Sequence, residues 1–127
     1  MKPKNVLLWI CRVLAAVIMI QTLYFKFSGS PESVYVFSQV GMEPEGRIAT
    51  GIAEAITSAL ILIPATSLYG AFFALFIMIG AIATHMFIIG IEVKGDHGLL
   101  FIYAIIVALA SVYIIVASIR KRKKIQV

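Results

Sequence analysis

The stretch from Gly98 to Ile119 is apolar throughout and contains no charged side chain. A run of about 20 such residues is long enough to cross the hydrocarbon core of a bilayer as an α-helix. The whole chain shares this character, because 61% of its 127 residues are hydrophobic, 13% are charged and the mean hydropathy is +1.02. Soluble domains average about 45–50% apolar and about 25% charged residues. The sequence therefore predicts a single-domain integral membrane protein.

Three further segments have the composition of membrane spans. The predicted spans are residues 5–27, 47–63, 68–90 and 98–119. Pro64 ends the second of them, and the uncharged turn at 64–67 is so short that the third span must be its antiparallel neighbour. The predicted fold is all-α, an integral membrane four-helix bundle with antiparallel, up-down connections.

Basic residues set the predicted orientation. Five of the eleven lysines and arginines form the run 120–124, and Lys2 and Lys4 lie near the other end of the chain. The loops at 28–46 and 91–97 hold only Lys94. Because cytoplasmic loops carry the excess of Lys and Arg, both termini are predicted to be cytoplasmic, in a bacterial inner membrane. Residues 120–127 then form a basic cytoplasmic tail facing membrane lipids, and no folded module suggests nucleic-acid binding.

The first outer loop contains the signals of a short helix. Ser30 can cap it, Pro31 suits its first position, and Gly41 can end it. Apolar residues at spacing three, namely Val34, Phe37 and Val40, would give it one apolar side. We therefore expect a short helix that lies at the outer interface.

Small residues recur at helical spacing within two spans. Gly51, Ala55 and Ala59 share one side of the second span. In the third span, Ala74, Gly80 and Ala81 have small side chains that make the helix narrower. Small residues let membrane helices approach closely, so these two sides are predicted helix contacts.

Ionisable side chains inside spans point to a site, because each costs about 3 kcal/mol at the centre of a membrane helix. From the rise per residue, Glu54 and His85 lie about 10 Å and about 8 Å below the outer surface, and Gln21 lies at a similar level. We therefore predict a polar pocket open to the outer side, with Glu54 and His85 as a proton-active pair. Its candidate ligand-binding residues are Gln21, Lys26, Arg47, Glu54, His85 and Asp96.

Structural interpretations stand beside this one. Glu54 could pair with His85 or with Arg47 only to fix the helix register, and Asp96 could serve as the acid at the start of the fourth helix. Arg12 can extend to the cytoplasmic head groups. No metal site is predicted, because His85 and His97 are too few ligands, and the single Cys11 excludes dithiol chemistry within the chain.

Several segments together resemble the DoxX family of small bacterial membrane proteins. They are 23–27, 41–48 with Gly51 and Glu54, 80–85, and 95–98, and the resemblance extends from about Leu7 to Ile119. It implies a four-helix membrane bundle and a link to quinone-dependent or other redox processes. The matching positions are Lys26, Glu43, Arg47, Gly51, Glu54, His85 and Asp96. The lack of a cysteine pair separates this chain from relatives that carry out dithiol chemistry.

Three functions are compatible with these features. The first is a quinone-linked or redox-accessory subunit that binds a quinone in the outer pocket. The second is a structural or assembly subunit, which would bind another membrane subunit or a second copy of the chain. The third is a small transporter of a lipid or an anion. None of these makes the chain an enzyme by itself.

Overall fold

The computed structural model describes residues 3–126, and this part of the chain is helical, with no strand. Its elements in order are α1 (Pro3–Ser28), α2 (Pro31–Gln39), α3 (Glu45–Leu62), α4 (Ser67–Thr84), the π-helical segment η1 (His85–Ile89) and α5 (Leu99–Gln126). The prediction of an all-α fold is confirmed.

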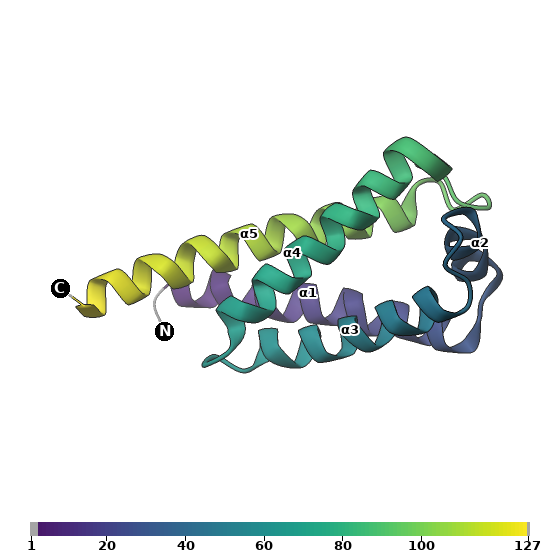
Figure 1. The fold of residues 1–127 in the computed structure, drawn as a ribbon. Helices are drawn as coiled ribbons and strands as arrows, with labels where there is room; N and C mark the ends of the chain where they lie inside the picture. Colours follow the sequence, from purple (N-terminus) through teal and green to yellow (C-terminus); the bar gives the residue numbers. More distant parts are fainter. Residues whose placement is uncertain (1–2, 127) are drawn as a thin grey trace.

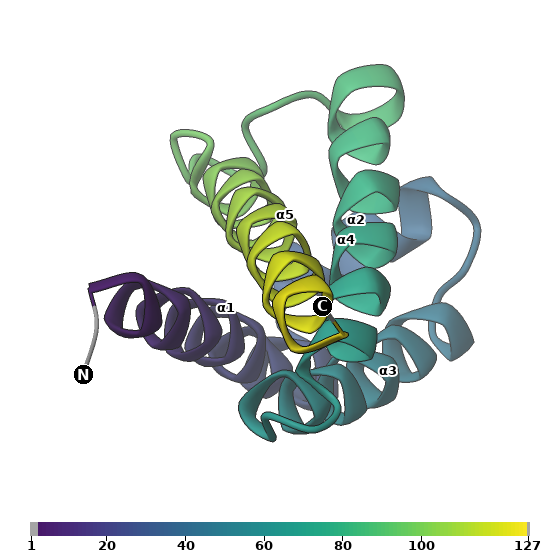
Figure 2. The same cartoon turned by 90° about the vertical axis from the view of Figure 1, so that its left-hand side faces the viewer.

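The long helices lie in two layers (Figure 1). Helix α1 packs against α3 and α5, and α4 packs against the same two helices. Figure 2, viewed from the end where α5 finishes, separates these four helices. Toward η1, α4 moves away from α3, and the short α2 lies across that end of the molecule. Helix α1 begins and α5 ends at the opposite end.

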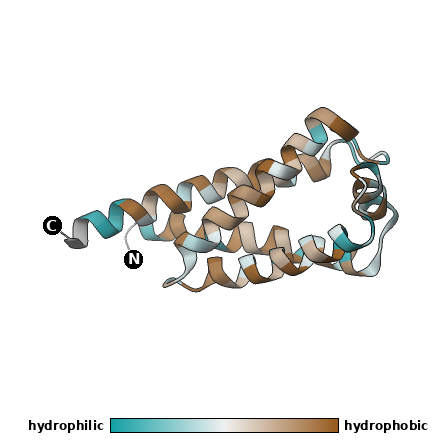
Figure 3. Cartoon of the chain, viewed as in Figure 1, coloured by the Kyte–Doolittle hydropathy of each residue, from teal (hydrophilic) through white to brown (hydrophobic). Residues whose placement is uncertain are grey.

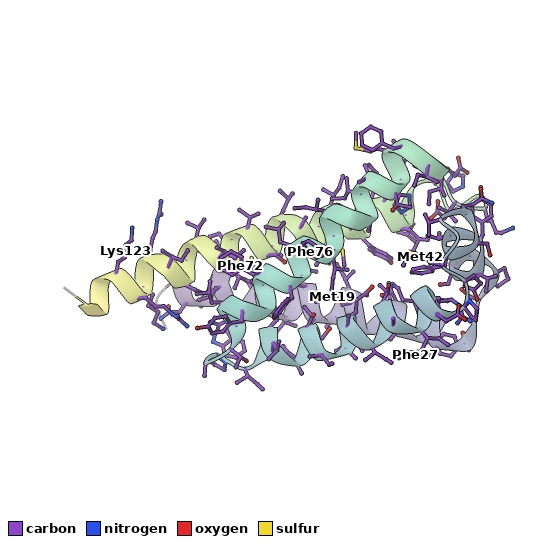
Figure 4. All side chains as sticks on the ribbon, in the orientation of Figure 1. Met19, Phe27, Met42, Phe72, Phe76 and Lys123 are labelled. Atoms are coloured by element: carbon purple, nitrogen blue, oxygen red, sulfur yellow. The ribbon has the colours of Figure 1, made fainter. Side chains whose placement is uncertain are left out.

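Small side chains fill the interior and large apolar ones cover the outside. Buried positions include five alanines that are at most 5% exposed, namely Ala15, Ala16, Ala71, Ala74 and Ala104. Met19 is also buried, and Figure 4 shows it between the layers. By contrast, Phe76 is 79% and Phe87 81% exposed. Hydrophobic residues dominate the middle of the molecule, and hydrophilic ones gather near its ends (Figure 3). A large apolar outer surface with small residues inside is what a lipid environment favours.

Three helices of the described part are long and apolar enough to span a membrane, over Asn5–Ser28, Ser67–Ile89 and Leu99–Lys123. The second predicted span is not among them. It corresponds to α3, whose 18 residues include Glu45, Arg47 and Glu54. Arg47 and Glu54 are nevertheless buried inside the protein, so much of the charge of α3 is turned away from its outer surface.

The helix ends differ from the predicted spans in two places. The third predicted span divides into α4 and η1, because the helix widens into a π-helical turn at His85. The basic residues that were predicted as a separate tail continue α5, which extends to Gln126.

The buried side of α3 explains which predicted helix contacts form. Arg47, Gly51, Glu54, Ser58 and Ile61 are buried at alternating spacings of four and three. Gly51 lies against the Phe27 ring, since a Cβ there would come within 2.8 Å of it. The prediction for Ala59 is wrong, because it falls beside this stripe and is exposed, and Gly80 on α4 is exposed as well.

Candidate functional site

A cavity of about 920 Å³ lies between the two layers at the end crossed by α2. Every helix and η1 contribute to its walls, which are mostly apolar. Five of the six predicted site residues line it, namely Gln21, Lys26, Glu54, His85 and Asp96. Ligand pockets commonly have this size and this mixture of apolar walls with a few polar groups.

Glu54 is only 3% exposed and is held by two residues of α1. Its Oε1 lies 3.0 Å from Nζ of Lys26, and its Oε2 lies 3.2 Å from the hydroxyl of Thr22. Lys26 Nζ also donates to the Thr22 hydroxyl at 3.4 Å. Neither His85 nor Arg47 is a partner of Glu54 among the described hydrogen bonds and ion pairs, so the polar cluster of α1 and α3 is Thr22–Lys26–Glu54.

Arg47 is placed differently from the prediction, because it does not line the cavity. Its Nε lies 2.9 Å and 3.0 Å from the two carboxylate oxygens of Glu43, and its Nη1 donates to the backbone carbonyl of Lys26. A cation that binds the last carbonyls of a helix stabilises that helix end. Arg47 therefore fixes the end of α1 that carries Lys26, and in this way it positions Lys26 in the cluster without contacting Glu54.

His85 lines the cavity at the first residue of η1 and is 5% exposed. Its Nδ1 lies 3.0 Å from the carbonyl oxygen of Gly90. A carbonyl oxygen can only accept, so Nδ1 carries a proton; in the tautomer with its single proton on Nδ1, Nε2 is an acceptor. Nε2 has no hydrogen-bond partner among the described residues. Single π-helical turns are frequent at functional sites, and this one presents an oriented imidazole to the cavity.

Asp96 organises the loop before α5. Its Oδ1 accepts from the backbone N–H groups of Val93 (2.9 Å) and Gly98 (2.8 Å), and its Oδ2 accepts from Leu100 N–H (3.2 Å). Burial acts to raise the pKa of this carboxyl, but the three backbone hydrogen bonds and the nearby His85 outweigh it and hold the pKa of Asp96 below its usual range. The hydrogen bonds agree with the structural interpretation, an acid at the start of the last helix, although Asp96 also borders the cavity.

Replacing Asp96 by alanine is expected to lower the unfolding free energy at neutral pH by about 1 kcal/mol, the usual cost of a lost capping side chain. Because the folded pKa lies below the unfolded value of about 3.9, the stabilisation is complete above that value and disappears as the pH falls through the folded pKa. Thermal melting of wild type and variant in detergent, followed by circular dichroism, should therefore differ at pH 7 and converge in acid.

Glu92→Ala is the matched control, since Glu92 is an exposed acid of the same loop with no hydrogen bond among those described. A constant difference between wild type and Asp96→Ala from pH 7 into acid would contradict the assigned role.

Two contributors to the site were missed at the sequence level. Thr22 precedes Lys26 by four residues, and this spacing places both on one side of a helix, so the signal was present. The other is α2, whose contribution to the site was not predicted. The helix itself was predicted and is confirmed with its Ser30 cap, where Ser33 N–H donates to Ser30 Oγ at 3.3 Å. Its residues Val36 and Phe37, and Val40 just after its end, form part of the cavity wall.

Comparisons of the chain with protein-family models, curated proteins and solved structures give no match.

Proposed function

We propose that this chain is a DoxX-like protein of the bacterial inner membrane that crosses the bilayer four times. In this proposal α3 also crosses the bilayer, and together with the three apolar helices it forms an antiparallel four-helix bundle. The inward-facing Arg47 and Glu54 support it, because charged residues in spans normally face the bundle interior. The basic end of α5 and the start of α1 lie at the same end of the molecule (Figure 1), which favours a cytoplasmic location for both termini.

We further propose that the protein binds a quinone and acts as a quinone-linked or redox-accessory subunit. The observation that carries this proposal is the cavity, in which mostly apolar walls meet the Thr22–Lys26–Glu54 cluster and the buried His85. A quinone has the same division, with a polar head and an apolar tail. When bound, it would supply two-electron, two-proton redox chemistry.

The polar residues fit both oxidation states of a quinone head. Lys26 can donate a hydrogen bond to a carbonyl oxygen, whereas Glu54 and the Nε2 of His85 can accept one from a hydroxyl group. Glu54 and His85 can also hold protons at Oε2 and Nε2. The chain contains no dithiol, so any net electron transfer would require a further subunit, and the protein is not proposed to be an enzyme by itself.

Quinone should co-purify with protein extracted in a mild detergent and should be detected by mass spectrometry of the solvent extract. Glu54→Gln and His85→Ala are each expected to weaken quinone binding about tenfold, because each removes a hydrogen bond worth about 1.5 kcal/mol at a charged or buried partner. Binding of added quinone is measured by titration in detergent.

The matched controls are Glu45→Gln and His97→Ala, which change exposed residues outside the cavity lining. They should bind quinone as the wild type does. A wild-type protein that neither carries nor binds quinone would exclude this function.

A structural or assembly subunit is the second candidate function. It is favoured by the contacts that join α1 to α3, in which Lys26 pairs with Glu54 and Arg47 binds the end of α1. This function predicts stable co-purification with a larger membrane complex that survives Glu54→Gln. A lipid or anion transporter is the third candidate, and it would require proton-dependent uptake in proteoliposomes.

A further inference from the structure

A second pocket, of about 320 Å³, lies at the end of the molecule where α1 begins and α5 finishes. Its polar lining includes Arg12, Lys121 and Arg122, and its apolar lining includes Leu8, Trp9 and Leu68. It is thus a basic pocket with an apolar wall, remote from the cavity that holds Glu54. Arg12 precedes Lys26 by fourteen residues of one helix, a separation of about 21 Å.

Arg12 is 7% exposed and has no carboxylate partner in the described part of the chain. Its Nε donates to the Ser67 hydroxyl at 3.0 Å, and its guanidinium carbon lies 4.8 Å from the centre of the Trp9 ring. These contacts orient the guanidinium without neutralising it. A buried charge is costly unless it is paired, so a guanidinium without a carboxylate among the described residues favours an anionic ligand in this pocket.

Acidic side chains are absent from the parts of α1 and α5 that border this pocket. All six acidic residues of the chain lie between Glu32 and Asp96, and none belongs to the first part of α1 or to α5. The exposed Arg120 and Lys123 of α5 add positive charge at this end, and Figure 4 labels Lys123. Arg122 lies over the Tyr69 ring, with 5.8 Å between its guanidinium carbon and the ring centre. The pocket is therefore lined by three cationic side chains and the Trp9 ring, and Tyr69 contacts its Arg122.

We propose that this pocket binds the phosphate of an anionic phospholipid. The arginine fork matches the geometry of phosphate oxygens, and Leu8 and Leu68 offer an apolar surface to the glycerol and the upper acyl chain. Trp9 and Tyr69 are the residue types enriched at the depth of lipid head groups. The apolar wall favours a lipid over free phosphate. This inference rests on the membrane location proposed above and not on quinone binding.

Trp9 is the only tryptophan of the chain, so its fluorescence reports on this pocket. The full-length protein in neutral mixed micelles is titrated with brominated phosphatidylglycerol or brominated phosphatidylcholine, whose bromines quench a nearby indole. The anionic lipid is expected to quench Trp9 at a concentration at least about tenfold lower than the zwitterionic lipid, corresponding to about 1.4 kcal/mol of preference.

Arg12→Gln should abolish this preference. Because Arg12 is buried and its replacement could impair folding, the double variant Lys121→Gln/Arg122→Gln, which changes two exposed side chains, is tested in parallel and should reduce the preference several-fold. Lys94→Gln removes one charge near the opposite end and should leave it unchanged.

Equal quenching by both lipids would overturn the proposal, as would an unchanged preference in the double variant. Displacement of the brominated anionic lipid by millimolar inorganic phosphate would show that the pocket takes free phosphate and would exclude the lipid assignment.

Discussion

Replacing Lys26 by methionine is expected to lower the unfolding free energy by about 3 kcal/mol or more, because removing one partner of a buried ion pair leaves the other charge uncompensated. The remaining charge is Glu54, which is 3% exposed and keeps only the hydroxyl of Thr22. The measurement is a denaturant titration in mixed micelles, followed by circular dichroism. Thermal melting should show the same order of stability.

A double variant tests whether the lower unfolding free energy of Lys26→Met comes from the uncompensated charge of Glu54. In Lys26→Met/Glu54→Leu both partners become apolar, and replacing a whole buried pair by apolar residues of similar volume is often neutral. The double variant should therefore be more stable than Lys26→Met alone. Lys123→Met, an exposed lysine of α5, is the control and should behave as the wild type.

A double variant no more stable than Lys26→Met would contradict the pairing. The same proteins separate two functions, because the double variant removes the polar cluster while preserving the fold. If Glu54 serves only to join α1 to α3, the double variant should retain any association with a larger complex. If the cluster binds a quinone head, it should lose quinone.

The level of the site within the molecule could be predicted from the sequence, but its partners could not. The rise per residue is fixed in a helix, so residues on three helices could be assigned to one layer, and five of the six candidates line one cavity. Pairing depends on helix rotation and on the reach of side chains. Lys26 was predicted as a ligand-binding residue, but its pairing with Glu54 depends on the reach of its long side chain.

Arg47 is a second residue whose partners could not be predicted from the sequence. Its seven-residue spacing from Glu54 is two helical turns, and both residues lie on the buried side of α3. Its guanidinium, however, turns toward Glu43 and the end of α1. No pattern along α3 alone could reveal this, because the accepting carbonyl belongs to Lys26, a residue of another helix.

The contact between α3 and α4 is closest at a glycine that the small-residue pattern did not select. A Cβ at Gly70 would lie 2.7 Å from the backbone nitrogen of Ile61 and 2.9 Å from the Cβ of Leu60. At Gly80, on the same helix, a Cβ would meet nothing within 4 Å. Helical spacing identifies residues that share a side, but which turn touches the neighbour depends on the short connection at 63–66, whose geometry sets where the helices cross.

Gly70→Ala and Gly80→Ala are therefore expected to have effects of opposite sign. At Gly70 the added methyl group meets backbone atoms, which cannot rotate away, so α3 and α4 must separate, at a cost of about 1–3 kcal/mol for overpacking. At Gly80 the methyl group enters open space, and alanine stabilises a helix interior by about 0.5–1 kcal/mol relative to glycine. Denaturant titration of both variants in the same micelles gives the two values directly. Equal changes at the two positions would mean that α4 does not approach α3 through Gly70, and the packing that positions the cavity walls would need to be reassigned.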